Sequence, residues 1–340
     1  MNMKRAIYLG KENVKITEAP IPEAGDKGAV IRNLYSSICG TDVAVYNHGP
    51  ETGHKITVGG EFGHETVSVV TAVGKDVKDI KVGDRVYPYP LYAKGDTKRA
   101  GTIGGFSEYI YIPEAKLGYS LYRVPEEIPD RTACLIEPFT VGTRAARRSM
   151  PKAGEKAVVF GCGTIGIAAA AALKYFGIEK VMICDIADFR LGIAKKLGFE
   201  VCNTSSESFI QRAKEYFGTA RCLTGETADA DIFIDAAGAE SILETFMQHG
   251  KFESRFVSVA VNKALRSLDL LHLTYGQQSI IGSGGYMPED VRDVFEIMKS
   301  RQDIGTVITH EYPIDRLSEA LKKASDSSCA LNVVINFSVK

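Results

Sequence analysis

A strand, a glycine-rich loop and an alanine-rich helix follow one another without a break between residues 156 and 175. The apolar run KAVVF leads into GCGTIG, and the helix-type segment IAAAAALKY follows it. Apolar strands such as KVMICD, DIFIDAAG and FVSVAV then alternate with helix-length amphipathic segments such as FRLGIAKKLG and ILETFMQHG. This alternation predicts an α/β fold with a doubly wound parallel sheet.

The glycine loop has the spacing that a dinucleotide pyrophosphate requires. Gly161 would permit the tight turn, Gly163 would let the backbone approach the phosphates, and Gly166 would let the helix pack on the strand. Thr164 and Ile165 open the helix, whose first N–H groups favour an anion. Glycines also interrupt ordinary loops, but the position between a strand and a helix favours cofactor binding.

The next strand ends at Asp185, where a carboxylate would accept hydrogen bonds from the ribose hydroxyls and repel a 2′-phosphate. This position favours NAD over NADP. Two alternatives remain open. Asp185 could simply start the following turn, and Arg190 could accommodate a phosphate.

The first 125 residues show a different sequence pattern, in which short β-type runs are separated by glycines. They predict a compact β-rich domain. A chain of 340 residues is also long enough for two domains. The last sixty or so residues either complete the parallel sheet or return to the first domain.

Composition excludes several classes of protein. The chain has 41 Lys and Arg against 42 Asp and Glu, and it lacks a long basic run, so nucleic acid is not an expected partner. No apolar window approaches eighteen residues, which disfavours a membrane protein. Seven cysteines, an odd number, are typical of reduced thiols, so we expect a cytoplasmic protein.

Residues with metal-binding side chains lie in the β-rich part and just after it. Cys39, the adjacent pair His64 and Glu65, and Glu137 offer a thiolate, an imidazole and two carboxylates. Such a set suits a Zn²⁺ ion with an open coordination position. Singly, each residue has an ordinary explanation in packing or surface polarity. The hypothesis depends on their occurring together with the dinucleotide loop.

Six motifs together resemble those of one family, the zinc-dependent medium-chain dehydrogenases/reductases. Within it, the resemblance is to the polyol branch of sorbitol, threonine and butanediol dehydrogenases. The motifs are CGTD (39–42), GHE (63–65), VGDRV (82–86), IEP (136–138), GCGTIG (161–166) and ITH (308–310).

The resemblance implies a GroES-like catalytic domain over 1–145 and 288–340, with a Rossmann NAD-binding domain over 146–287 between its two parts. It also implies that Cys39, His64 and Glu65 approach the zinc. Glu137 would be the fourth ligand or would bond to the metal's water, and Thr41 would carry the hydroxyl proton away. The implied reaction transfers hydride between a secondary alcohol or polyol and NAD, giving the ketone.

The chain departs from the family at two places that affect the chemistry. Ala44 stands where many relatives have a histidine that passes the proton on to solvent, so the relay would end at the cofactor ribose or at water, or use another group such as His48. Residues 87–106 contain no cysteine, whereas most relatives have four close together that hold a structural zinc. We therefore expect one catalytic zinc ion per chain and no structural zinc.

The resemblance also implies a homodimer or homotetramer, with FVSVAV and SLDLLHLTYGQQSIIG as candidate edges of the sheet. Two alternative functions remain. One is a zinc-free reductase of activated double bonds, and the other is a non-catalytic NAD-binding relative.

Overall fold

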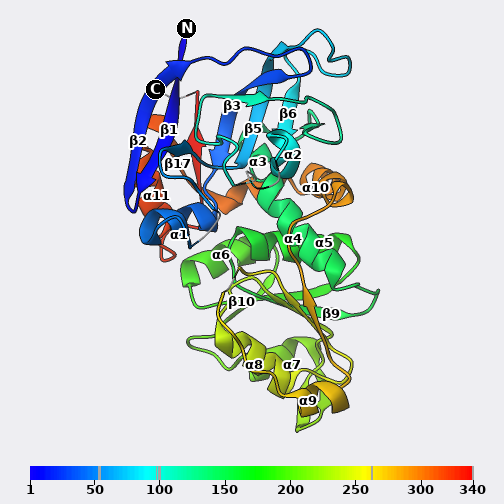
Figure 1. Cartoon of the computed structure of the whole chain (residues 1–340). Helices are drawn as coiled ribbons and strands as arrows, with labels where there is room; N and C mark the ends of the chain where they lie inside the picture. Colours follow the sequence, from blue (N-terminus) through cyan, green and yellow to red (C-terminus); the bar gives the residue numbers. More distant parts are fainter. Residues whose placement is uncertain (53–54, 97, 99–100, 262, 339–340) are drawn as a thin grey trace. The chain divides into compact units, whose positions relative to one another are not determined.

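A computed structural model describes residues 1–52, 55–96, 98, 101–261 and 263–338 (Figure 1). The chain divides into two compact units. Unit 1 comprises Met1–Glu137, Met298–Asp326 and Ala330–Lys340, and unit 2 comprises Pro138–Ile297 and Ser327–Cys329. The two main crossings from one unit to the other lie within helices α4 (Ile136–Arg148) and α10 (Pro288–Ser300). The domain boundaries at 145/146 and 287/288 stay a prediction.

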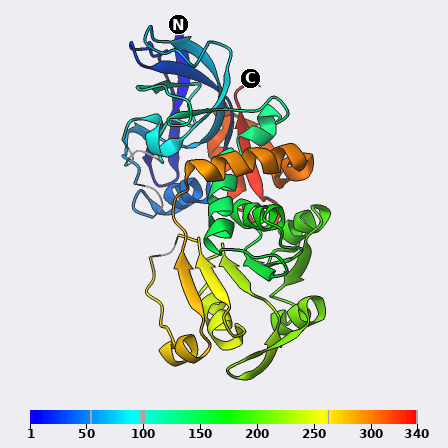
Figure 2. The same cartoon turned by 90° about the vertical axis from the view of Figure 1, so that its right-hand side faces the viewer.

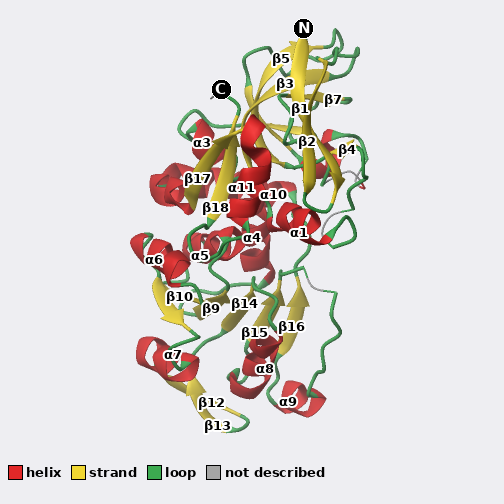
Figure 3. Ribbon diagram, turned by 90° about the vertical axis from the view of Figure 1, so that its left-hand side faces the viewer, coloured by secondary structure: helices red, strands yellow, loops and turns green. Residues whose placement is uncertain are grey.

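Unit 1 is built on a sheet with the order β17-β18-β3-β5-β6-β8, in which β7 also pairs with β3, and on a smaller sheet β2-β1-β4. Helix α11 packs on β17 and β18 (Figure 3). The strands are β1 (Asn2–Gly10), β2 (Asn13–Pro20), β3 (Ala29–Ser37), β4 (Gly60–Glu61), β5 (Glu65–Val73), β6 (Arg85–Pro88), β7 (Tyr109–Ile112), β8 (Leu121–Arg123), β17 (Ile308–Pro313) and β18 (Asn332–Asn336). The helices are α1 (Gly40–His48), α2 (Pro90–Ala93), α3 (Asp130–Ala133) and α11 (Leu317–Ala324), with 3₁₀ turns at Gln302–Val307 and Ile314–Arg316.

Strands β3 and β5 form the centre of this sheet; β5 is rich in β-branched residues that pack well on a pleated surface, and β3 is largely buried. They pair antiparallel, with Ser37 opposite Glu65. On its other side β3 pairs antiparallel with β18, with Val334 opposite Ser37. A strand from the segment that follows unit 2 therefore pairs with the central strand of this sheet. This places β18 next to the end of β3, after which Cys39 follows.

Unit 2 contains a six-stranded sheet of order β11-β10-β9-β14-β15-β16, in which every neighbouring pair is parallel. In Figure 2 the yellow-to-orange strands β14, β15 and β16 lie side by side and point the same way. The strands are β9 (Lys156–Phe160), β10 (Lys180–Asp185), β11 (Glu200–Asn203), β14 (Ile232–Asp235), β15 (Arg255–Ser258) and β16 (Ser279–Gly282), with a separate hairpin of β12 (Thr219–Cys222) and β13 (Gly225–Ala228). The helices are α5 (Thr164–Tyr175), α6 (Asp188–Lys196), α7 (Phe209–Phe217), α8 (Glu240–His249) and α9 (Leu270–Tyr275).

The predicted α/β class with a parallel sheet is confirmed. The strand order reverses between β9 and β14, and ligands of doubly wound sheets bind at the carboxyl ends of the strands at such a point. Of the helices in the described part of the chain, none is long and apolar enough to cross a membrane.

Candidate active-site residues

Cys39 comes directly after β3 and caps the N-terminus of α1. Its backbone N–H donates to the Asp42 carboxylate at 3.1 Å, which closes the first turn of the helix. The Thr41 hydroxyl donates to the Cys39 sulfur at 3.2 Å. The short CGTD segment thus fixes both the backbone and the thiol of Cys39 by local hydrogen bonds.

His64 and Glu65 stand at the start of β5. The preceding Gly63 has φ of +86°, and a Cβ atom there would lie 2.7 Å from the Phe106 ring, so a side chain at this position would be strained. A Cβ atom on Gly105 would lie 2.8 Å from the His64 backbone nitrogen. The loop that ends at Phe106 is therefore packed tightly against the backbone that carries the histidine.

The structure brings three of the predicted ligands together. One ligand atom from each of Cys39, His64 and Glu65 lies within 4.8 Å of the others, and His64 and Glu65 are only 3% and 2% exposed. Glu65 Oε2 is buried and has no hydrogen-bond partner among the described residues. A thiol, an imidazole and a carboxylate oxygen without a partner, converging in a buried place, fit a zinc ion.

Electrostatics at the cluster also favour a cation. Burial raises the pKa of the Cys39 thiol well above its ordinary value, and nearby carboxyl groups raise it further. Burial likewise raises the pKa of Glu65, and it raises the pKa of Asp42 to about 7. Because these groups oppose one another's ionisation, a dication among them would stabilise their charged forms.

Glu137 lies in the first turn of α4 and is 7% exposed. It is outside the group whose ligand atoms lie within 4.8 Å of one another. Its charge nevertheless contributes to the raised pKa values of Cys39 and Asp42, so it lies in the same electrostatic environment. Its part in holding the metal stays a prediction.

Asp42 is a buried carboxyl group that the motifs did not single out as a site residue. It is fully buried, and its Oδ1 lies 3.9 Å from Nδ1 of His64. A carboxylate behind a ligating histidine orients the ring. Its spacing from Cys39, three residues later with a capping role, was the signal available in the sequence.

The dinucleotide loop has the geometry that its glycines predicted. Gly161 has φ of +100°, and a Cβ atom there would lie 3.0 Å from the backbone of Ala236 and Ala237. A Cβ atom on Gly166 would lie 1.8 Å from the Gly161 carbonyl oxygen, whereas one on Gly163 would meet nothing within 4 Å. Two glycines thus serve packing, and the third, which caps α5, leaves open space at the helix N-terminus.

The first turn of α5, with Thr164 and Ile165, is half-buried beside this space. Asp185 ends β10 and binds the loop directly, because its Oδ2 accepts the backbone N–H of Cys162 at 2.5 Å. The backbone of Arg190 also touches the loop, since its carbonyl oxygen accepts the Cys162 thiol at 3.2 Å. The structure therefore places all the predicted cofactor residues around one loop.

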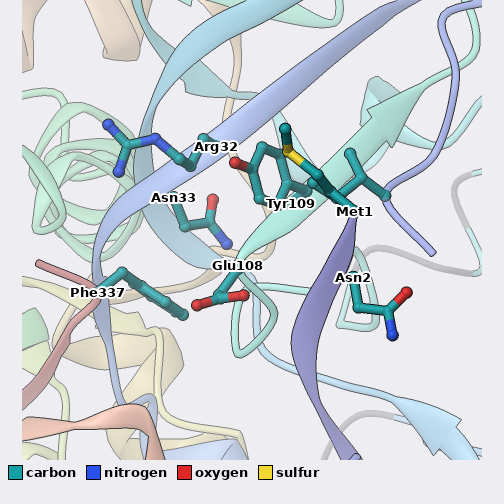
Figure 4. A pocket seen from close by; sticks show the side chains of 8 residues that line it. Met1, Asn2, Arg32, Asn33, Glu108, Tyr109 and Phe337 are labelled. Carbon is teal, nitrogen blue, oxygen red and sulfur yellow. The ribbon is translucent and has the colours of Figure 1, made fainter. Parts of the chain in front are cut away.

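A pocket of about 410 Å³ lies elsewhere on unit 1 (Figure 4). It is lined by Met1, Asn2, Ile21, Arg32, Asn33, Glu108, Tyr109 and Phe337. In Figure 4 the Arg32 guanidinium points away from Met1 and Asn2. The Asn33 amide is already bonded to the carbonyl oxygen of Ser107 at 2.7 Å. This pocket contains none of the candidate ligands and is separate from the metal cluster.

Two family models match the chain. One, described as "Alcohol dehydrogenase GroES-like domain", matches residues 25–125, and the other, "Zinc-binding dehydrogenase", matches residues 164–300. The chain belongs to the zinc-dependent medium-chain dehydrogenase/reductase family. The resemblance inferred from the motifs is confirmed, and so are the GroES-like and Rossmann components of the fold.

Similar proteins agree with this membership. L-threonine 3-dehydrogenase of Proteus mirabilis is 29% identical over 328 residues, which cover 89% of this chain and 91% of the relative. Among solved structures, 2R,3R-butanediol dehydrogenase of Bacillus subtilis is 25% identical with a TM-score of 0.84, and the match covers 98% of this chain and 99% of that one. L-idonate 5-dehydrogenase of Escherichia coli, at 20% identity and a TM-score of 0.82 over 99% of both chains, shares the fold. This family member is an oxidoreductase of the alcohol and polyol dehydrogenase type.

Proposed function

We propose that this protein oxidises a secondary alcohol or polyol to the ketone with NAD, at a single zinc ion. The observation that carries the proposal is the buried cluster of Cys39, His64 and Glu65, in which one carboxylate oxygen has no protein partner among the described residues. The relatives named for threonine and butanediol support a substrate with a polar group beside the reacting alcohol.

Cys39, His64 and Glu65 would hold the zinc, and Glu137 would be either the fourth ligand or a hydrogen-bond partner of its water. A bound zinc would lower the pKa of the substrate hydroxyl, and NAD would accept the hydride. Asp42 would keep the His64 ring oriented through its buried carboxylate. Burial of the ligands would exclude water from the reacting groups.

Thr41 is the chain's own candidate for moving the hydroxyl proton. Its hydroxyl lies two residues from the zinc cysteine and donates to the Cys39 sulfur. Ala44, one turn further along α1, carries no group that can take the proton onward. The relay would therefore end at the cofactor ribose or at water, or use another group such as His48 at the end of α1.

NAD is the favoured cofactor because the Asp185 carboxylate lies at the dinucleotide loop. Solved structures of the same fold include one complexed with NADH and one bound to NADP, so the fold accepts both. Asp185 would disfavour the 2′-phosphate of NADP, whereas Arg190 could accommodate that phosphate.

A cluster of tyrosines supports the proposal of one zinc per chain. Tyr92 stacks on Tyr119 with ring centroids 4.5 Å apart, and Tyr89 meets the edge of Tyr122 at 5.7 Å. Tyr87 is fully buried against Tyr122. Residues 87–106 contain no cysteine, so aromatic packing rather than a structural zinc would stabilise this segment.

We also propose a homodimer or homotetramer in the cytoplasm, with a small-molecule substrate and no nucleic-acid or membrane partner. Strand β16 is an edge of its sheet, and α9 buries none of its residues. Leu270, Leu271 and Tyr275 are 65%, 61% and 63% exposed, which is typical of a surface covered by another subunit. All seven cysteines are free thiols, as in a reducing compartment.

The test has two parts. Metal analysis of the purified protein gives the zinc content per chain, and NADH absorbance measures turnover of L-threonine, 2,3-butanediol and sugar alcohols. We expect one zinc per chain and turnover of at least one diol or hydroxy amino acid. Cys39→Ala should lose both the zinc and the turnover, whereas Cys222→Ala, a buried thiol in unit 2, should keep both.

Other outcomes would overturn the proposal. A zinc-free protein that reduces enones would be the metal-independent reductase. NAD binding without turnover of any substrate would indicate a non-catalytic relative, and two zinc ions per chain would contradict the single-metal site.

A further inference from the structure

Two buried polar side chains, Ser37 and Asn332, lie near Glu65 and have no part in the function proposed above. Ser37 and Asn332 are buried with Glu65, at 0%, 3% and 2% exposure. The Asn332 side-chain amide donates to the Ser37 hydroxyl at 2.9 Å, and the Ser37 side chain acts to lower the pKa of Glu65, against the larger effect of burial. A line of buried polar side chains therefore runs from β18 to a candidate metal ligand.

The register of the sheet makes this line possible. Ser37 ends β3 directly opposite Glu65, which begins β5, so their side chains share one face. Strand β18 pairs with the other edge of β3, and Asn332 is its first residue. The neighbouring Ser36 hydroxyl also donates to the Glu65 backbone carbonyl at 3.0 Å. Backbone and side chain of Glu65 are thus held from the same strand.

One oxygen of the Glu65 carboxylate, Oε2, has no hydrogen-bond partner among the described residues. A buried carboxylate oxygen without a partner is destabilising unless a cation binds it. The arrangement therefore leaves Oε2 for the metal.

We propose that Ser37 and Asn332 are positioning residues that fix Glu65 in the orientation needed to bind the zinc ion. The inference rests on the proposed function, since it presumes that the cluster of Cys39, His64 and Glu65 holds a metal. Asn332 orients the Ser37 hydroxyl, and Ser37 in turn sets the rotation of the carboxylate. Outer-shell partners of this kind contribute about 10- to 100-fold to metal affinity.

Zinc affinity, measured by competition with a chromogenic chelator, tests the pair. Ser37→Ala and Asn332→Ala should each weaken zinc binding by roughly 10- to 100-fold. The double variant should be no worse than the worse single one, because Asn332 acts through the Ser37 hydroxyl. Ser37→Thr, which keeps the hydroxyl, should bind zinc within a few-fold of the unaltered protein.

Asn336→Ala is the matched control. Asn336 lies in the same strand, is 4% exposed, and bonds to Tyr35 and Glu311 rather than toward Glu65. Its loss should lower the unfolding temperature of the metal-free protein about as much as Asn332→Ala, with unchanged zinc affinity. The absorption spectrum of the cobalt-substituted protein should shift in Ser37→Ala and Asn332→Ala and stay the same in Asn336→Ala.

The outcomes separate this inference from the proposed function. If the unaltered protein binds zinc and oxidises alcohols while Ser37→Ala and Asn332→Ala match it in affinity and spectrum, the positioning role is wrong and the function stands. Equal weakening in Asn336→Ala would also overturn it, because a general loss of strand packing would then explain the effect. An unaltered protein that binds no zinc would overturn both.

Discussion

At the scale of single residues, the carboxylate of Asp185 holds the dinucleotide loop and would also select the cofactor. Asp185 Oδ2 accepts the N–H of Cys162 at 2.5 Å, and its Oδ1 accepts those of Ile186 and Ala187 at 2.7 and 2.9 Å. These bonds hold a negative charge at the end of β10, beside the first helix of the dinucleotide fold. The charge, rather than the bonds alone, would exclude a 2′-phosphate.

Replacing Asp185 with Asn should therefore change cofactor choice. We expect the ratio of kcat/KM for NAD to that for NADP to fall by about tenfold or more, because the charge that repels the phosphate is gone. Steady-state rates with both cofactors measure this ratio. Asp229→Asn, an equal loss of charge outside the loop, should leave it unchanged, and an unaltered ratio in Asp185→Asn would contradict the role.

The sequence predicted the candidate ligands but not the polar residues beside them. Cys39, His64 and Glu65 stand in short motifs, and the joint resemblance of six motifs to one family, rather than the spacing of these residues, predicted that they bind zinc. Ser37 and Asn332 lie 295 residues apart and meet only because β18 pairs with β3. No local pattern carries that information, since it depends on which strands become neighbours.

At the scale of elements, different glycines of the dinucleotide loop have different tasks: Gly166 allows close packing, and Gly163 leaves space where a cofactor could bind. Gly166 has no room for a Cβ atom, which would lie 1.8 Å from the Gly161 carbonyl oxygen, and Gly163 has ample room. The strand, loop and helix were predicted from alternation because all three are local. The hairpin β12–β13 was not predicted, because its short exposed strands give little periodic signal.

Alanine at these two glycines should therefore give different results. Gly166→Ala should lower the free energy of unfolding by about 1–3 kcal/mol, as overpacking does, and also weaken NAD binding. Gly163→Ala should change stability by less than about 0.5 kcal/mol and weaken NAD binding tenfold or more, because its methyl group occupies the space beside the helix N-terminus. Chemical denaturation and NADH fluorescence titration measure the two effects. Equal stability of the two variants would contradict the assignment.

At the scale of the whole molecule, ion pairs make the stability depend on pH, and exposed apolar surfaces bear on the oligomeric state. Lys251 lies 2.6 Å from Asp229, and Lys156 bonds to the same carboxylate. Burial alone would raise the pKa of Asp229, but the hydrogen bonds from Lys156 and Lys251 outweigh it and lower the pKa. These three residues tie the start of β9 to the segments that flank β14.

A lowered pKa makes this contribution depend on pH in one direction. The stabilisation is present above the unfolded pKa of about 3.9 and is lost as pH falls through the lower folded value. Asp229→Asn should therefore be less stable by about 1–2 kcal/mol at pH 7, with the difference shrinking below about pH 4. Urea unfolding across that range measures it. A difference that grows on acidification would contradict the ion pair.

The exposed surface of β16 and α9 should determine the oligomeric state. Leu271→Glu combined with Tyr275→Glu should give a monomer in sedimentation or light scattering, because two charges would be buried at the subunit contact. Tyr175→Glu, at a side chain that is 46% exposed on α5, should keep the oligomer. An oligomer that survives the double change would place the interface elsewhere.

The insertion of unit 2 into unit 1 has a consequence for the order of events during synthesis. Almost all of unit 2 is contiguous in the chain, so it can fold while the ribosome is still translating the rest. The central strand β3 must wait for its neighbour β18, which follows unit 2 in the chain. The sheet edge that carries Cys39, His64 and Glu65 is thus completed only after unit 2 has been translated, and a zinc ion would then meet a finished site on a chain whose unit 2 can already have folded.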